Sequence, residues 1–248
     1  MDNPEHPPRT VVIMGAGAIG LALAADLIKT FSECKCLLTY RNNKPEISDK
    51  RISLFKLDAL NEEAFPELIE YVERSFGEVD WLINTIGLLH DADNGIQPEK
   101  RLQNFNLSQF QTVMATNVVP TVLAAKYFSR LWPKSRSAVF ASISARVGSI
   151  SDNRLGGWHS YRASKSSLNM MLKNIALEWS YKKPNVCVLS LHPGTTDSGL
   201  SEPFQKNVPE GKLFSPERTA RYLIDVISTK SPDDSGCFYD WSNKPIPW

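Results

Sequence analysis

Short strand-like runs and longer helix-like runs alternate along nearly the whole of this 248-residue chain. In the longer runs the apolar residues recur at intervals of three and four, which places them on one face of a helix. Strict alternation predicts a parallel sheet with helices on both faces, because two parallel neighbours need a crossover connection. Right-handed crossovers then predict a doubly wound α/β fold with ligands at the carboxyl ends of the strands.

About seven strands and six helices are expected from this pattern. The predicted strands span residues 10–14, 36–40, 52–57, 79–84, 137–142, 186–191 and 236–240. The predicted helices span residues 18–31, 62–76, 107–113, 117–131, 161–180 and 219–228. No linker or internal repeat divides residues 1–248, so we expect a single domain. Its irregular segments, at about 87–106, 145–160 and 194–216, are predicted to be substrate loops beside the ligand.

The composition excludes several classes of partner. Lys plus Arg number 28 against 27 Asp plus Glu, so binding to nucleic acid or to an anionic membrane is not expected. The four cysteines and four histidines have no metal-ligand or disulfide spacing, which favours reduced thiols and no metal site. Residues 1–9 lack a secretory signal and no apolar stretch approaches about 18 residues, so a soluble, cytoplasmic protein is predicted.

A glycine-rich turn follows the first predicted strand and opens the first predicted helix. Residues 15–20 read GAGAIG, the GxGxxG spacing of a dinucleotide-binding loop. The alternative is a plain strand-to-helix turn that needs glycine for its backbone. Because the motif lies in the first strand–helix–strand unit, we expect it to hold a pyrophosphate at the helix N-terminus. The predicted cofactor-binding residues of this turn are Gly15, Gly17, Ala18, Ile19 and Gly20.

The end of the second predicted strand bears on which dinucleotide is bound. NAD-specific folds place an acidic residue about 20 residues after the glycine loop, where it bonds the ribose hydroxyls. Here residues 40–44 read YRNNK, with no carboxylate before Glu46. Arg41 can pair with a 2′-phosphate, so NADP(H) is favoured and NAD(H) is the alternative. A solvated loop arginine without a function would also explain this residue.

Tyr161 and Lys165 lie four residues apart at the head of the longest predicted helix. Residues at this spacing share a helix face, so the phenol and the ammonium point the same way. A nearby cation stabilises phenolate and lowers the pKa of tyrosine, which makes the phenol a usable acid or base near neutral pH. Taken alone, the pattern is common by chance, and a packed aromatic residue with a surface lysine explains it equally well.

Together with other landmarks, however, this pair makes the chain resemble the short-chain dehydrogenase/reductase family. The resemblance covers nearly the whole length, from Val11 to Trp248. The family's landmarks follow in order: the glycine loop, Asp58, Asn84 and Gly87, Asn117, serines after the fifth strand, Tyr161 with Lys165, and Pro193–Gly194. The segments GLLH at 87–90, GGW at 156–158 and IPW at 246–248 are similar to the subgroup called C-factor or cell-to-cell signalling proteins. The chain is also similar to carbonyl reductases of the Sniffer type. The resemblance implies a Rossmann fold.

The resemblance also implies roles for single residues. The tyrosine matching Tyr161 protonates the carbonyl oxygen or removes the alcohol proton, and the lysine matching Lys165 bonds the nicotinamide ribose and lowers the tyrosine pKa. The asparagine matching Asn117 holds a water in a proton relay. The remaining matches are to cofactor contacts: Asp58 to the adenine ring, Asn84 and Gly87 to the segment that lies along the adenosine side and steadies the sheet, and Pro193, Gly194, Thr195 and Thr196 to the carboxamide.

Three features depart from the family pattern. The glycine loop is one residue shorter than the usual TGxxxGxG, and Thr85-Ile86 stand where Asn-Ala is usual. The family's Ser-Ser-x-x-Gly, aligned on Gly148, puts Ala145 at the second serine, which polarises the carbonyl, and Ser144 at the first. We predict that Ser144 takes this role, with Ser142 as the alternative; a missing donor to the oxyanion can cost on the order of 100-fold in rate.

The sequence therefore predicts an NAD(P)-dependent oxidoreductase that transfers hydride between the cofactor and a small carbonyl compound or secondary alcohol. A dinucleotide-binding, C-factor-like signalling or regulatory protein with little turnover is the alternative, and the missing second serine motivates it. Helices matching residues 117–131 and 161–180 form a dimer interface in many family members, whereas single-domain carbonyl reductases include monomers. A homodimer, a homotetramer and a monomer are all consistent with the sequence.

Overall fold

The computed structural model describes residues 7–248, so residues 1–6, part of the stretch 1–9 in which no secretory signal is expected, lie outside the described part. Its main sheet has seven parallel strands in the order β3-β2-β1-β4-β5-β6-β9. The strands are β1 (Thr10–Met14), β2 (Lys35–Tyr40), β3 (Ile52–Lys56), β4 (Trp81–Asn84), β5 (Ala138–Ile143), β6 (Val186–His192) and β9 (Cys237–Asp240). The predicted α/β fold with a doubly wound parallel sheet is confirmed.

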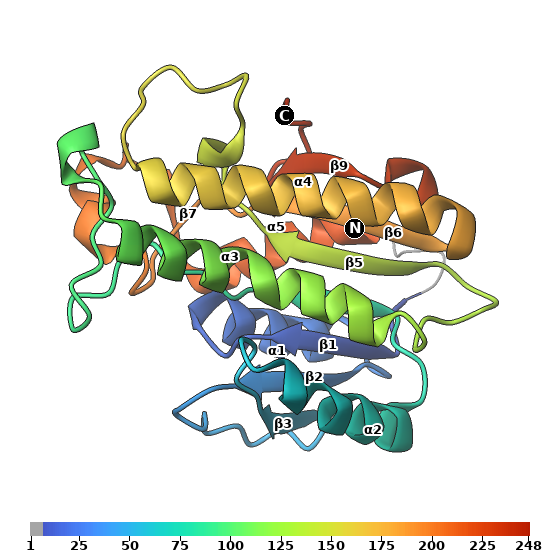
Figure 1. Ribbon diagram of the computed structural model, residues 1–248. Coiled ribbons are helices and arrows are strands. Elements are labelled where there is room, and N and C mark those ends of the chain that lie inside the picture. Colours follow the sequence, from blue (N-terminus) through green and yellow to red (C-terminus); the bar gives the residue numbers. More distant parts are fainter. Residues whose placement is uncertain (1–6) are drawn as a thin grey trace.

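Five helices cover the two faces of the sheet (Figure 1). They are α1 (Ala18–Thr30), α2 (Phe65–Phe76), α3 (Leu107–Phe128), α4 (His159–Lys182) and α5 (Pro216–Ser228). The buried apolar residues of α2, α3 and α4 form one core with the sheet, and those of α1 and α5 form the core on the opposite face. A small parallel pair, β7 (Thr195–Thr196) and β8 (Leu213–Phe214), lies in the segment after β6.

The prediction of two helices within residues 107–131 is wrong, because α3 is continuous. Pro120 lies inside it and lacks the N–H that would bond one turn back. The helix nevertheless continues, since Asn117, Thr121 and Ala124 are fully buried between the sheet and α4. Tertiary packing of this kind outweighs one lost backbone hydrogen bond.

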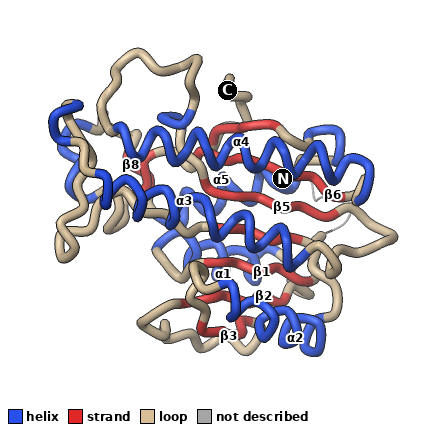
Figure 2. The backbone as a smooth tube through the Cα atoms, in the orientation of Figure 1, coloured by secondary structure: helices blue, strands red, loops and turns tan. Residues whose placement is uncertain are grey.

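The order of the strands reverses between β1 and β4, which are neighbours in the sheet. The chain runs outward from β1 to β3 and then returns through α2 to β4, beside β1. Strands β1, β2 and β3 follow one another outward on one side of this point, and β4, β5, β6 and β9 on the other. Loops that leave two adjacent strands in opposite directions open a crevice at the carboxyl edge, where ligands bind in folds of this type. The longest loops gather at this edge, on the left in Figure 2.

A polar clasp closes the opposite, amino-terminal edge of the sheet. The buried carboxylate of Asp80 accepts hydrogen bonds from the backbone N–H groups of Arg9 and Thr10, both at 2.9 Å. The same carboxylate accepts from Nε of Arg136, 2.5 Å away. Asp80 therefore joins the starts of β1, β4 and β5. Within residues 7–248, no helix has the length and the apolar character needed to cross a membrane.

Candidate active site

Two cavities meet along the crevice at the carboxyl edge. The larger has a volume of about 680 Å³ and lies between the ends of β1, β2 and β3 and the start of α3. The smaller, of about 270 Å³, lies between the ends of β5 and β6, the first turn of α4 and the segment 195–208. Thr85, Ile86 and Gly87 line both cavities, so the two form one continuous groove.

The glycine loop forms one wall of the larger cavity. Gly15 has φ of +104°, a left-handed conformation that side chains rarely adopt. A Cβ on Gly20 would stand 1.9 Å from the carbonyl oxygen of Gly15, so α1 packs directly against the loop. A Cβ on Gly17 would have no atom within 4 Å, which leaves the backbone open toward the cavity.

Thr85 fastens this loop to the next strand. Its hydroxyl lies 2.9 Å from the carbonyl oxygen of Gly15 and 3.0 Å from that of Met14, and it donates to these acceptors. Asn84 does not line either cavity. It is buried behind the groove, where its amide donates to Thr121 and Ser142 and its carbonyl oxygen accepts from the N–H of Ile86. Asn84 thus acts on the groove through the backbone, whereas the family resemblance predicts a cofactor contact.

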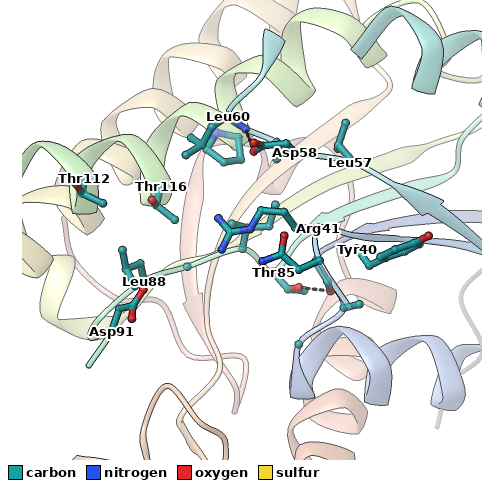
Figure 3. A pocket seen from close by; sticks show the side chains of 18 of the residues that line it. Tyr40, Arg41, Leu57, Asp58, Leu60, Thr85, Leu88, Asp91, Thr112 and Thr116 are labelled. Carbon is teal, nitrogen blue, oxygen red and sulfur yellow. Dashed lines mark hydrogen bonds between the residues drawn. The ribbon is translucent and has the colours of Figure 1, made fainter. Parts of the chain in front are cut away.

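Arg41 extends from the end of β2 into the larger cavity (Figure 3). Asp58 and Leu60 lie on one side of it and Thr85 on the other, and the guanidinium points toward Leu88 and Thr116. Asp58 accepts a hydrogen bond from the N–H of Leu60 at 3.0 Å. Among the described lining residues Arg41 is the one cation, and Asp58 and Asp91 are the acids.

Tyr161 and Lys165 lie on the first turns of α4, and both line the smaller cavity. The Nζ of Lys165 is 5.7 Å from the centroid of the Tyr161 ring and donates to the carbonyl oxygen of Ile143 at 2.9 Å. Burial lowers the pKa of Lys165 to about 8 and raises the pKa of the Tyr161 phenol above its usual range. The raised phenol pKa is opposite to the predicted direction, and burial, which disfavours the charged phenolate, is its cause.

Asn117 lies fully buried in the middle of α3 and joins three segments. Its carbonyl oxygen accepts from the N–H of Leu88 at 2.6 Å, and its amide donates to the Leu88 carbonyl and to the Ser164 hydroxyl. A Cβ on Gly87 would lie 3.5 Å from both the Asn117 carbonyl oxygen and the Lys165 Nζ. Asn117 therefore fixes the strand-end loop beside the lysine.

The two candidate serines after β5 have different surroundings. Ser144 lines the smaller cavity, and its hydroxyl donates to the side-chain oxygen Oδ1 of Asn169 at 2.7 Å. Ser142 does not line either cavity; it belongs to the buried cluster with Thr121 and Asn84. Of the two serines, only Ser144 faces the groove within the described structure.

The segment after β6 closes the other side of the smaller cavity. Pro193, Gly194, Thr195 and Thr196 line it, as does Ile19 from α1. Ala18 and Gly20 of the glycine motif lie outside both cavities, although Gly20 supports the loop by packing. Apolar side chains provide most of the remaining wall of the smaller cavity: Leu89, Val147, Trp158, Leu200, Phe204 and Val208.

Several residues that organise the groove escape prediction from the sequence. Thr85 stands out there only as a departure from Asn-Ala, and no pattern singles out Asn169. Glu99 lies in a polar stretch, PEKR, that is typical of a solvated loop. Each acts through a contact with residues far along the chain, which local spacing does not reveal. No group of three or more His, Cys, Asp or Glu side chains positioned to hold a metal occurs within residues 7–248.

Known proteins resemble this chain in sequence. A family model described as short chain dehydrogenase matches residues 9–209. The 1-hydroxy-2-glutathionyl-2-methyl-3-butene dehydrogenase of Rhodococcus sp. (strain AD45) is 37% identical over 106 residues, 43% of this chain and 45% of that protein. The C-signal protein of Myxococcus xanthus is 25% identical over 174 residues, 69% of this chain and 94% of that protein.

Solved structures share the fold. The carbonyl reductase Sniffer of D. melanogaster superposes with a TM-score of 0.82 at 20% identity, covering 97% of this chain and 99% of that one. An NADPH-bound carbonyl reductase from chicken fatty liver superposes with a TM-score of 0.82 at 22% identity, covering 100% and 97%. The family match covers most of the chain, and the seven-stranded fold agrees with it. This protein therefore belongs to the short-chain dehydrogenase/reductase family, a family of oxidoreductases that use a nicotinamide cofactor.

Proposed function

We propose that this protein is an NADPH-dependent carbonyl reductase with Tyr161 as its proton donor. The observation that carries the proposal is the position of Tyr161 and Lys165 in a small, mostly apolar cavity that shares Thr85, Ile86 and Gly87 with the larger cavity beside the glycine loop. In such a site the nicotinamide supplies or accepts the hydride, and the protein positions the reactants and moves the proton.

The groove offers a candidate partner for each part of a dinucleotide. The open backbone at Gly17 and the N-terminus of α1 would receive the pyrophosphate, as an unobstructed helix N-terminus attracts anions. Asp58 would meet the adenine side, and the backbone from Pro193 to Thr196 would meet the carboxamide. Lys165 would hold the nicotinamide ribose.

The preference for NADPH rests on Arg41. The end of β2 offers a guanidinium and the two asparagines Asn42 and Asn43, and no carboxylate that would repel a 2′-phosphate. The chicken carbonyl reductase that shares the fold is an NADPH-bound protein. We expect Arg41→Ala to weaken NADPH binding about tenfold or more and to leave NADH binding unchanged, because a hydrogen bond between charged groups is lost only for NADPH. Fluorescence titration with both cofactors measures this, and equal losses would contradict the assignment.

The ionisation of the pair suits reduction. Burial keeps the Tyr161 phenol protonated at neutral pH, so it is in the form that donates to a carbonyl oxygen. Lys165, with a pKa of about 8, still holds a proton there and places a positive charge beside the ring as the phenol loses its proton. Ser144 would polarise the same oxygen after its hydroxyl turns from Asn169 toward the cavity.

The test compares Tyr161→Phe with Tyr181→Phe, a control on the same helix whose side chain is 91% exposed. Aldehydes, ketones, quinones and benzil are offered with NADPH; benzil is included because a Bacillus subtilis relative is a benzil reductase. We expect Tyr161→Phe to lower kcat about 100- to 10,000-fold with the NADPH Kd unchanged, since one proton donor is lost. Full activity of Tyr161→Phe would contradict the assignment.

A regulatory dinucleotide-binding protein is a second candidate function. Its support is that Ala145 replaces a hydroxyl in the groove and the Ser144 hydroxyl donates to Asn169. The likeness to the Myxococcus xanthus C-signal protein agrees with it. Tight NADPH binding by the unaltered protein without turnover of any carbonyl in the panel would favour this candidate over the reductase.

A further inference from the structure

The helix that carries Tyr161 begins without a cap from its own sequence. Its N-cap residue, Trp158, has φ of 49° and ψ of 45° and offers no side-chain hydrogen bond to the first turn. The first turn contains no acidic residue. The free N–H groups and the positive end of the helix dipole at this point therefore need a partner from elsewhere.

Glu99 supplies that partner from the loop that follows β4. Its side chain is 2% exposed, and one carboxylate oxygen accepts from the N–H of Ser160 at 3.1 Å. The Ser160 hydroxyl donates to the other carboxylate oxygen. The backbone carbonyl of Glu99 accepts from the N–H of Trp158 at 2.6 Å. One residue thus binds both Trp158 and Ser160, the latter 61 positions away in the sequence.

The backbone before α4 is shaped to reach Glu99. Gly156, Gly157 and Trp158 have φ of 63°, 66° and 49°, three left-handed residues in succession. Only glycine adopts this conformation without cost, so Trp158 is held there by its surroundings. A Cβ on Gly157 would lie 3.6 Å from the Glu99 carbonyl oxygen, which shows how closely the two segments pack.

The contact joins the cofactor side of the groove to the proton donor. The segment 87–106 lines the larger cavity through Leu88 and Asp91 and then reaches α4 at Glu99. Tyr161 is the residue after Ser160, and the Trp158 ring packs against Tyr161 and Phe204 with centroids 6.2 Å and 5.0 Å apart. A displacement at Glu99 therefore moves the phenol and one wall of the substrate cavity together.

Resting on the carbonyl reductase function proposed above, we propose that Glu99 is a positioning residue that sets Tyr161 by the length and hydrogen bonding of its side chain. Within residues 7–248 no ion pair involves Glu99, so its charge is balanced by the start of α4 and the Ser160 hydroxyl. A glutamine has the same length and offers one acceptor and one donor, and Ser160 can pair with both. An aspartate keeps the charge but is one methylene too short.

The experiment compares Glu99→Gln and Glu99→Asp, with Asp93→Asn as the control because Asp93 is an exposed acid of the same loop. We expect Glu99→Asp to lower kcat about 10- to 100-fold, as small misplacements of reacting groups do, with the NADPH Kd unchanged. We expect Glu99→Gln to stay within about threefold of the unaltered protein, since its hydrogen bonds are kept. Hydrogen exchange of the amides in residues 157–163 should quicken in Glu99→Asp alone.

The opposite order, with Glu99→Asp active and Glu99→Gln impaired, would show that charge and not position matters and would overturn the proposal. Equal activity and equal exchange in all three variants would overturn it as well. If the unaltered protein turns over no carbonyl, the proposed function fails by itself. The exchange of residues 157–163 then still decides whether Glu99 holds the start of α4.

Discussion

Burial of the Lys165 ammonium costs the cofactor-free protein free energy of folding. Lys165 is 2% exposed, and its ammonium has one carbonyl acceptor, that of Ile143. Burial disfavours its charged form, and its pKa falls from 10.5 to about 8. At neutral pH the folded protein therefore holds a charge that the unfolded chain would leave in water, and this lowers the free energy of unfolding.

Lys165→Met should stabilise the cofactor-free protein while it removes activity. The shift of the Lys165 pKa from 10.5 to about 8 corresponds to a gain of up to about 3 kcal/mol in the free energy of unfolding of the variant at pH 7. Between pH 8 and pH 10.5 the lysine of the unfolded chain keeps a proton that the folded protein has lost. The stability of the unaltered protein therefore rises with pH in this range. The advantage of the variant should therefore shrink from pH 8 to 10.5. Urea unfolding across this range measures it, with Lys182→Met, an exposed lysine of the same helix, as the control.

For single residues, the sequence predicts which side chains lie together, but it does not predict how burial changes their pKa values. Spacing alone places Tyr161 and Lys165 on one face of a helix, and both line the same cavity. The predicted direction of the Tyr161 pKa shift is wrong, because burial raises this pKa. The burial of the ring depends on residues distant in the sequence, so local sequence does not predict it. The choice between Ser142 and Ser144 likewise depends on where β5 ends, at Ile143.

The glycine loop and α1 act as one element, and two of the glycines have separable tasks. Gly17 leaves open space toward the groove, whereas Gly20 lets the helix touch the loop. Both are glycine in the motif, but only one of them faces the cavity. Substitution by alanine should therefore produce different defects at the two positions.

Gly20→Ala should destabilise the fold by more than about 2 kcal/mol, because its Cβ would collide with the Gly15 carbonyl oxygen. Gly17→Ala should change stability by less than about 0.5 kcal/mol, since its φ of −77° suits alanine and the space is open. The new methyl group of Gly17→Ala should instead weaken NADPH binding by about tenfold or more. Thermal unfolding and NADPH titration of both variants separate the effects. A Gly17→Ala variant that binds NADPH as tightly as the unaltered protein would refute the assignment of Gly17 to cofactor binding.

Element boundaries show what periodicity can and cannot supply. Five helices form where six are expected because α3 runs through Pro120, where burial against α4 decides against local propensity. Helix α4 starts at His159 and not at residue 161, since its cap comes from Glu99 and not from the residues before the helix. Both differences arise from contacts between distant parts of the chain.

In the whole molecule, the candidate site and the Asp80 clasp lie at opposite edges of the sheet. The groove lies at the carboxyl ends of the strands, and the Asp80 clasp lies at the amino ends. The alternation of elements predicts this place for the groove, because parallel strands bring all their carboxyl ends to one edge. It does not predict the clasp, whose members Arg9, Asp80 and Arg136 are far apart in the chain.

Asp80→Ala should cost about 2–5 kcal/mol of stability, because it leaves two backbone donors without their acceptor and leaves Arg136 with Glu78 as its remaining ion-pair partner. The affinity for NADPH of the protein that remains folded should not change. Glu73→Ala, which removes an exposed ion pair with Arg130, should cost less than about 1 kcal/mol. Denaturant titration with and without NADPH measures both quantities. A loss of NADPH affinity in Asp80→Ala would show that the two edges are coupled.

The continuous groove has one shared floor, Thr85 to Gly87, and two ends that share no other lining residue. The tip of β2 touches only the coenzyme end, and Trp158 and Phe204 touch only the other. For protein engineering these are two independent design variables. If the protein has the proposed function, a library at positions 41–43 should change the preference between NADPH and NADH without narrowing the range of substrates accepted. A library at 85–87 would force both properties to change at once.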